Sequence, residues 1–108
     1  MTQFVEITIT YPSREQALAA GRELVEQRLA ACAHISPVTS IYRWQGAVHE
    51  EPEYTLAVKT SIHLVEKIKH LVVAGHPYDL PQFVANPLSD MSREYRQWLQ
   101  QSLTADSG

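Results

Sequence analysis

Apolar and polar residues alternate along two stretches of the chain, residues 4–10 and residues 54–60. Successive strand residues point to opposite faces, so each stretch predicts a strand with one buried face. The apolar positions on these faces are Val5, Ile7, Ile9, Tyr54, Leu56 and Val58. Residues 37–44 are rich in β-branched and aromatic side chains and predict a further strand, and residues 82–86 before Pro87 predict a short one.

Three other stretches carry apolar residues three or four positions apart, the spacing of an amphipathic helix. Ser13 and Gln16 have the pattern of a capping box that opens the first helix, and Ser61 is placed to cap the second. Ser89 or Ser92 opens the third. The side chains expected to face inward are Ala17, Leu18, Gly21, Leu24, Val25 and Leu29 in the first helix, Leu64, Val65, Ile68, Leu71 and Val72 in the second, and Met91, Tyr95, Trp98, Leu99 and Leu103 in the third.

The predicted order is strand, helix, strand, strand, helix, strand, followed by an extra C-terminal helix. This is the order of an α+β, ferredoxin-like fold, in which two helices cover one face of a four-stranded antiparallel sheet. We expect a single domain over residues 1–108, with residues 104–108 as a frayed tail.

The second and third strands are expected to form a long hairpin that reverses at Gln45-Gly46, where a glycine tolerates the positive φ of a tight turn. Its far end, with Tyr42 and Trp44, extends past what one small core can cover. The sheet face away from the helices is then either exposed to solvent or packed against another copy of this chain. Both features point to a partner subunit.

Composition narrows the class of protein. The net charge is −3 and the nine Lys and Arg residues are scattered, so we expect no nucleic-acid partner and no attraction to an acidic membrane. No apolar stretch is long enough to span a bilayer, and no secretion signal is expected. Cys32 is the single cysteine, which excludes an internal disulfide and fits a reducing compartment, the cytoplasm.

Metal binding is the first candidate chemistry. Cys32 and His34 lie two apart, so in an extended segment a thiolate and an imidazole share one side, a pair that suits copper or zinc. His76 follows the second predicted helix, whose dipole favours a charged imidazole, and Asp79 in the same loop offers an oxygen ligand. The alternatives are that Cys32 is a packed thiol and that the proline-stiffened loop is a structural clamp.

A ligand cleft between subunits is the second candidate. Tyr42, Trp44 and Tyr78 are aromatic residues suited to line such a cleft, and Lys59 on the polar sheet face could hold an anionic ligand. The alternatives are that the aromatic residues anchor a subunit interface and that Lys59 is solvated or ion-paired.

Catalysis finds little support in the sequence. The four glycines are isolated, so no phosphate-binding loop is present, and no nucleophile elbow occurs. The acidic patch of Glu50, Glu51 and Glu53 is interpreted as a solvated turn, because Pro52 interrupts it and it lacks a calcium-loop pattern. We therefore expect a protein that is not an enzyme.

Five motifs are individually distinctive. They are Leu24–Ala33, Thr39–Gly46, Val58–Thr60, His76–Tyr78 with Pro81, and Tyr95 with Trp98. In this order they resemble the CutA family of divalent-cation tolerance proteins. The resemblance implies a ferredoxin-like protomer in a compact homotrimer, with strands of neighbouring subunits paired edge to edge, as in the PII signalling proteins. It also implies a role in tolerance of copper and other divalent ions.

The sequence departs from that family in several places, including Gln82 where a Glu is common and Asn86 where an apolar residue is usual. It has one residue fewer between Pro37 and Thr39, which predicts an altered bulge or strand register. The copper site that the resemblance implies uses a Cys in the first strand and two adjacent histidines. Ile9, Gly75 and His76 occupy those positions, so one of the three ligand types is present.

Three functional hypotheses follow. The first is a non-enzymatic homotrimer for tolerance of divalent metal ions such as copper, which binds ions weakly through His76 with Cys32 or Asp79. The second is a PII-like sensor of a small anionic ligand in the subunit cleft, and the third is a purely structural assembly platform. The side chains expected at subunit contacts are Ile41, Tyr42, Trp44, Tyr95 and Trp98.

Overall fold

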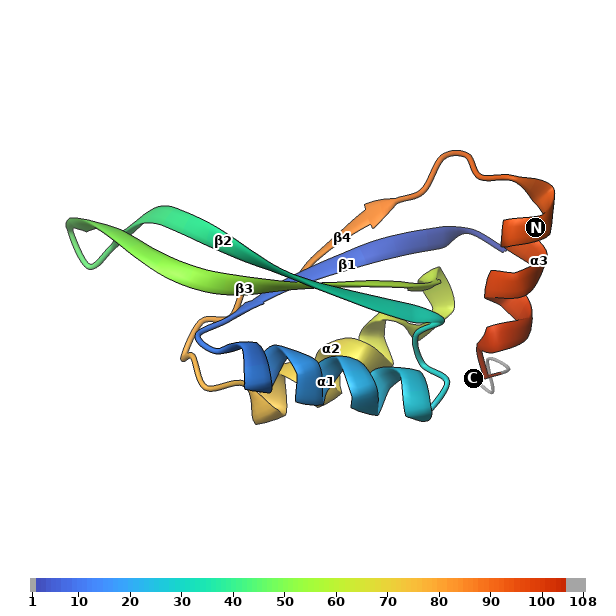
Figure 1. The fold of residues 1–108 in the computed structure, drawn as a ribbon, viewed down its shortest axis with the longest axis horizontal. Helices are drawn as coiled ribbons and strands as arrows, with labels where there is room; N and C mark the ends of the chain where they lie inside the picture. Colours follow the sequence, from blue (N-terminus) through green and yellow to red (C-terminus); the bar gives the residue numbers. More distant parts are fainter. Residues whose placement is uncertain (1, 105–108) are drawn as a thin grey trace.

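The computed structural model describes residues 2–104 and has the α+β, ferredoxin-like architecture that the sequence predicts (Figure 1). The elements are β1 (Phe4–Tyr11), α1 (Arg14–Glu26), β2 (Cys32–Trp44), β3 (Ala47–Ser61), a short 3-10 helix (Ile62–Leu64), α2 (Val65–Gly75), β4 (Val84–Pro87) and α3 (Arg93–Ser102). The four strands form one antiparallel sheet in the order β2-β3-β1-β4. Helices α1 and α2 lie side by side against one face of this sheet (Figure 1).

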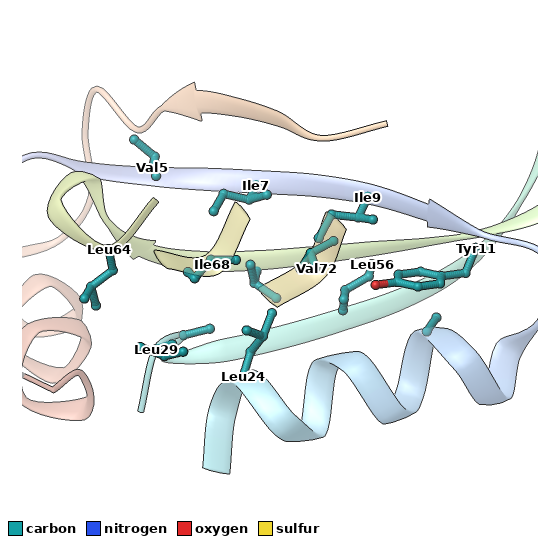
Figure 2. Close-up of a cluster of buried hydrophobic side chains, with 13 residues drawn as sticks. Val5, Ile7, Ile9, Tyr11, Leu24, Leu29, Leu56, Leu64, Ile68 and Val72 are labelled. Atoms are coloured by element: carbon teal, nitrogen blue, oxygen red, sulfur yellow. The ribbon is translucent and has the colours of Figure 1, made fainter. Parts of the chain in front are cut away.

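The main core lies between the sheet and these two helices (Figure 2). Ile7, Ile9, Leu56 and Val58 are fully buried there, as the alternation along β1 and β3 predicts. The inward stripes of α1 and α2 are confirmed at Ala17, Leu24, Ile68 and Val72. Leu29 and Leu64, which lie just outside these helices, belong to the same buried cluster. The helix margins differ, because Val25 and Leu71 are exposed.

Capping side chains set the helix boundaries. Ser13 Oγ accepts a hydrogen bond from the backbone N–H of Gln16 at 3.2 Å, which confirms the predicted start of α1. Of the two candidate caps for α3, Ser92 is the one that accepts from a backbone N–H, that of Tyr95. Helix α1 ends before Leu29, because Arg28 adopts a φ of 60°, and Leu29 is then buried from a loop rather than from the helix.

The third helix packs on the opposite sheet face. Phe4, Leu99 and Ala31 form a second buried cluster there, at one end of the sheet. Trp98 was expected to face inward, but it is 43% exposed, because Leu99 takes the buried position beneath α3. No helix within residues 2–104 is long and apolar enough to cross a membrane.

The hairpin of β2 and β3 is longer than the sequence predicts. Its ladder runs without a break from the Cys32–Lys59 pair to the Trp44–Ala47 pair, so the segment between Pro37 and Thr39 contains no bulge. Gln45 and Gly46 have φ values of 50° and 81°, as a two-residue reversal requires. The extended ribbon accounts for the 44 Å length of the chain, against 26 Å and 23 Å in the other directions.

Two predictions about exposed segments are wrong. Glu53 does not lie in a solvated turn, because β3 extends to Ala47 and places it mid-strand, where the residue is 8% exposed. Thr104 is not frayed, since its backbone N–H donates to the carbonyl oxygen of Arg28 at 2.8 Å. The rest of the predicted tail, residues 105–108, lies outside the described residues.

Candidate functional site

A pocket of about 610 Å³ lies between the outer half of the hairpin and the loop that follows α2. A cavity of this volume is in the range of small-molecule sites. Its lining residues are Thr10, Ser40, Ile41, Tyr42, Arg43, Trp44, Glu53, Pro77, Tyr78, Asp79, Leu80 and Gln82. It therefore brings together three of the four predicted cleft residues, Tyr42, Trp44 and Tyr78, with one predicted metal ligand, Asp79.

Chain topology explains why these segments meet. Strand β1 ends at Tyr11, whose pairing partner on β3 is Tyr54, so the part of β3 before Tyr54 has no β1 neighbour. The segment between α2 and β4 passes across this end of the sheet on its way back to pair with β1 (Figure 1). It thereby faces the root of the extended ribbon and closes the pocket on that side.

His76 holds the loop to the end of β1. Its ring stacks on Tyr11 with 4.4 Å between ring centroids, and its Nε2 lies 2.8 Å from the carbonyl oxygen of Thr10. The backbone N–H of Tyr78 donates to Nδ1 at 3.1 Å. These two bonds describe a neutral imidazole with its proton on Nε2.

The pKa of His76 is lowered from its ordinary value, because partial burial disfavours the charged ring more than the Thr10 carbonyl and Glu53 favour it. The sequence predicts that the helix dipole favours a charged His76, whereas partial burial favours the neutral ring. The chain leaves the helical conformation at His76, whose ψ is 141°, so its ring is directed to β1.

Tyr78 and Glu53 form the best-defined polar pair of the pocket. The Tyr78 hydroxyl donates to Glu53 Oε2 at 2.6 Å. Burial, and then the hydrogen bond and charge of Glu53, raise the pKa of Tyr78. Tyr78 supplies the one hydrogen bond that Glu53 accepts among the described residues, and no wholly buried side-chain oxygen there lacks a partner. The other carboxylate oxygen of Glu53 is therefore open to the pocket.

A second tyrosine–glutamate pair lies farther out on the ribbon. The Tyr42 hydroxyl donates to Glu51 Oε2 at 2.9 Å, and the pKa of Tyr42 is raised mainly by this bond. The Tyr42 ring stacks on His49 with 5.4 Å between centroids. Among the lining side chains, Glu53 and Asp79 carry negative charge and Arg43 carries positive charge. The pocket thus has an excess of negative charge.

Lys59, the fourth predicted cleft residue, lies elsewhere. Its Nζ is 3.2 Å from Glu6 Oε2, and it is paired across the ladder with Cys32. Partial burial alone would lower the pKa of Lys59, but the hydrogen bond to Glu6 and the nearby Cys32 outweigh it and raise the pKa. Ser40 of the pocket is eight residues farther along β2 than Cys32, which is about 26 Å in a strand.

The predicted metal ligands are likewise not gathered in one place. Cys32 Sγ lies 3.8 Å from the Tyr95 hydroxyl under α3, and both ring nitrogens of His76 are already hydrogen-bonded. Only Asp79 lines the pocket, where Glu53 is the other carboxylate. Within residues 2–104, no three His, Cys, Asp or Glu side chains are grouped as metal ligands.

Sequence reasoning missed Glu53, although a signal was present. Lys59 is predicted on the polar face of β3, and the period of two that places it there continues to Glu53 and Glu51. Pro52 obscured this alternation, because proline is unfavourable inside a sheet. Here the Pro52 position on β3 has no β1 partner, so no ladder bond to β1 is lost.

The comparisons with known proteins agree on one family. Residues 5–102 match the family described as CutA1 divalent ion tolerance protein. A divalent-cation tolerance protein CutA from Thermus thermophilus is 50% identical over 97 residues, which cover 89% of this chain and 94% of that protein.

Solved structures extend the agreement to the fold. The Cut A1 structure from Thermus thermophilus has a TM-score of 0.87 and 48% identity, over 96% of this chain and all of that one (100%). A structure from Archaeoglobus fulgidus, described as a periplasmic divalent cation tolerance protein, has a TM-score of 0.87 and 32% identity, over 94% and 98% of the two chains. The resemblance found in the motifs is confirmed, and the chain belongs to the CutA1 divalent ion tolerance family.

Proposed function

We propose that this protein acts in divalent-cation tolerance as a non-enzymatic homotrimer that binds divalent ions weakly and reversibly. Membership of a family described by ion tolerance supports the biological role. The polar side chains of the pocket support binding rather than catalysis, because its hydrogen bonds tie His76 to backbone groups and Tyr78 to Glu53. The lone Cys32, a reduced thiol, supports a cytoplasmic location, although one structural relative is described as periplasmic.

The buried Glu53 carboxylate carries the proposal of an ion site. It keeps one oxygen open to a pocket that also contains the exposed Asp79 carboxylate. Two carboxylates leave most of a divalent ion's coordination to water, which fits weak binding. Copper would gain little from these oxygen ligands alone, since it is favoured by imidazole and thiolate, and His76 offers a ring nitrogen only if its bond to Tyr78 breaks.

The outer half of the hairpin supports the homotrimer. Residues 47–53 of β3 have no β1 neighbour and β2 is an edge strand, so both sides of the ribbon carry unpaired backbone groups. Ile41 and Val48 are 67% and 63% exposed on it. A two-stranded ribbon is marginally stable in water by itself, and exposed edges favour pairing with another chain.

Titration calorimetry with Cu²⁺, Zn²⁺ and Mn²⁺ tests the ion site. Asp79→Asn is expected to weaken binding, with Asp90→Asn as the matched control outside the pocket. Equal binding heats for Asp79→Asn and the wild type would contradict the site.

Sedimentation equilibrium tests the assembly separately. The expected mass is three times the 12.2 kDa of one chain, and a stable single chain at micromolar concentration would contradict the trimer.

The volume of the pocket favours a second candidate function, a sensor of a small anionic ligand. About 610 Å³ exceeds what a hydrated ion needs, and the guanidinium of Arg43 is available at its lining for an anionic group, the role first assigned to Lys59. A ligand that binds the folded state raises the melting temperature. Thermal-shift screening of nucleotides and organic acids on the wild type and Arg43→Gln would therefore reveal it, and no shift across the set would reject it.

A further inference from the structure

A second, smaller groove lies on the helical side of the molecule, between α1 and α2. Its volume is about 230 Å³, and Ala19, Ala20, Leu71 and Pro77 are among its apolar lining residues. Its polar lining side chains are those of Tyr11, Gln16 and Glu23. It is separate from the hairpin pocket, because the two cavities have only Pro77 in common.

The Tyr11 hydroxyl is an unused polar group in this groove. Tyr11 is 4% exposed, and Figure 2 shows its side chain extending from the end of β1 into the space between the sheet and α1. Its ring is held by stacking on His76, but its hydroxyl has no hydrogen-bond partner among the described residues. Since no wholly buried side-chain oxygen there lacks a partner, the hydroxyl must open into the groove that Tyr11 lines. Such a hydroxyl gains a hydrogen bond from any occupant that supplies one.

Glu23 gives the groove its charge. It is the one charged residue among the described lining side chains, and it is close enough to Tyr11 that its charge, after burial, raises the pKa of that hydroxyl. One of its carboxylate oxygens accepts from the Gln27 side chain at 3.2 Å. The other remains available, so the polar end of the groove presents a carboxylate oxygen and a neutral hydroxyl together.

We propose that the groove between α1 and α2 binds a small organic ammonium ion, with its ammonium group between Glu23 and the Tyr11 hydroxyl and its apolar body between the helices. An ammonium group can donate three hydrogen bonds, so it can donate one to the Glu23 carboxylate and one to the Tyr11 hydroxyl oxygen. A bare metal ion is a poorer match, because Glu23 is the one carboxylate among the described lining side chains and the remaining polar side chains, Tyr11 and Gln16, are neutral. The site is independent of the divalent-ion site in the hairpin pocket.

The size of the groove limits the occupant. Pockets for drug-sized ligands have volumes of about 300 to 1,000 Å³, so a groove of about 230 Å³ suits a smaller ligand, such as a primary amine with an apolar body of about five carbons. Pentylamine, which is cationic at neutral pH, is therefore a suitable probe. Pentan-1-ol and pentanoate share its chain length and supply the matched neutral and anionic probes.

Amide chemical-shift titration of the ¹⁵N-labelled full chain tests the proposal. Pentylammonium is expected to shift amides of residues 16–24 and 71–77 more strongly than either matched probe. Glu23→Gln should weaken binding about threefold or more, the range of a solvent-accessible charge pair. Tyr11→Phe, which keeps the ring on His76, should weaken it about tenfold, as expected for one hydrogen bond to a charged group at the low end of its range. Glu26→Gln, at the C-terminal end of α1 and outside the groove lining, should leave binding unchanged.

Three outcomes would overturn the proposal. The first is equal shifts with pentanoate or pentan-1-ol, which would mean that charge plays no part. The second is equal affinity for Glu23→Gln and Glu26→Gln in folded variants, judged by their dispersed amide spectra. The third is a set of shifts confined to residues 40–44 and 77–82, which would place the ammonium ion in the hairpin pocket instead.

Discussion

Removal of one hydroxyl from the hairpin pocket, by Tyr78→Phe, gives the sharpest test of its electrostatics. The substitution deletes the 2.6 Å hydrogen bond to Glu53 and leaves a carboxylate that is 8% exposed without a protein donor. The backbone bond from Tyr78 to His76 is retained, because it uses the main-chain N–H. The loss is therefore confined to a single charge-assisted hydrogen bond.

A hydrogen bond to a charged group contributes about 1.5–3 kcal/mol. The other Glu53 oxygen faces the pocket, so water can approach the carboxylate and compensate part of the loss. We expect the free energy of unfolding to fall by about 2 kcal/mol, roughly a 30-fold change in the unfolding equilibrium constant. Urea denaturation at one fixed protein concentration measures this free energy, since the stability of the proposed oligomer would depend on concentration.

Tyr54→Phe is the matched control, because the Tyr54 hydroxyl makes no hydrogen bond among the described residues. A difference below about 0.5 kcal/mol between the free energies of unfolding of the two variants would refute the reasoning.

The pH dependence of stability adds an independent check. The raised pKa of Tyr78 means that folding favours its neutral form, so its contribution is complete below about pH 10 and is lost as pH rises further. The difference in free energy of unfolding between the wild type and Tyr78→Phe should therefore become smaller above about pH 10.

Three further predictions concern other parts of the chain. Neutral His76 has a lowered pKa in the folded protein, so its contribution is present above about pH 6.5 and lost as pH falls; His76→Gln should flatten the acid limb of a stability profile. Thr60→Val should lower the free energy of unfolding by about 1–3 kcal/mol in urea denaturation, because the buried Leu29 carbonyl loses the 2.6 Å bond from the Thr60 hydroxyl. Ile41→Lys on the ribbon should reduce the sedimenting mass, whereas Val73→Lys on α2 should not.

The fold could be predicted from the sequence because its strongest signals are periodic. Alternation along β1 identified a strand buried on one face, and Ser13 marked the start of α1. The start of β3 could not be placed, because the outer half of the ribbon covers no apolar core within one chain and the apolar alternation disappears there. Residues 47–53 therefore resembled a polar turn, although they pair along their whole length with β2.

The aromatic lining of the candidate site could be predicted from the sequence, but its charged residue could not. Aromatic residues at Tyr42, Trp44 and Tyr78 were recognisable as lining groups by type alone. Their charged neighbour was misassigned, because Lys59 and Glu53 lie on the same polar face of β3, six residues and about 20 Å apart. Only the closure of the loop over the ribbon root decides which of the two enters the pocket, and that contact between distant segments has no local sequence signal.

The unbroken ladder from β2 to β3 links the pocket to the surface that we propose contacts neighbouring chains. Tyr42 and Glu53 lie on one face of the ribbon, whereas Ile41 and Val48 lie on the other. A one-residue slip of β2 against β3 would exchange these faces, moving the aromatic residues out of the pocket. The ladder contains no bulge from the Cys32–Lys59 pair to the Trp44–Ala47 pair, so the two-residue turn at Gln45 and Gly46 fixes the register of the whole ribbon. The same turn therefore determines both the pocket chemistry and the exposed apolar edge.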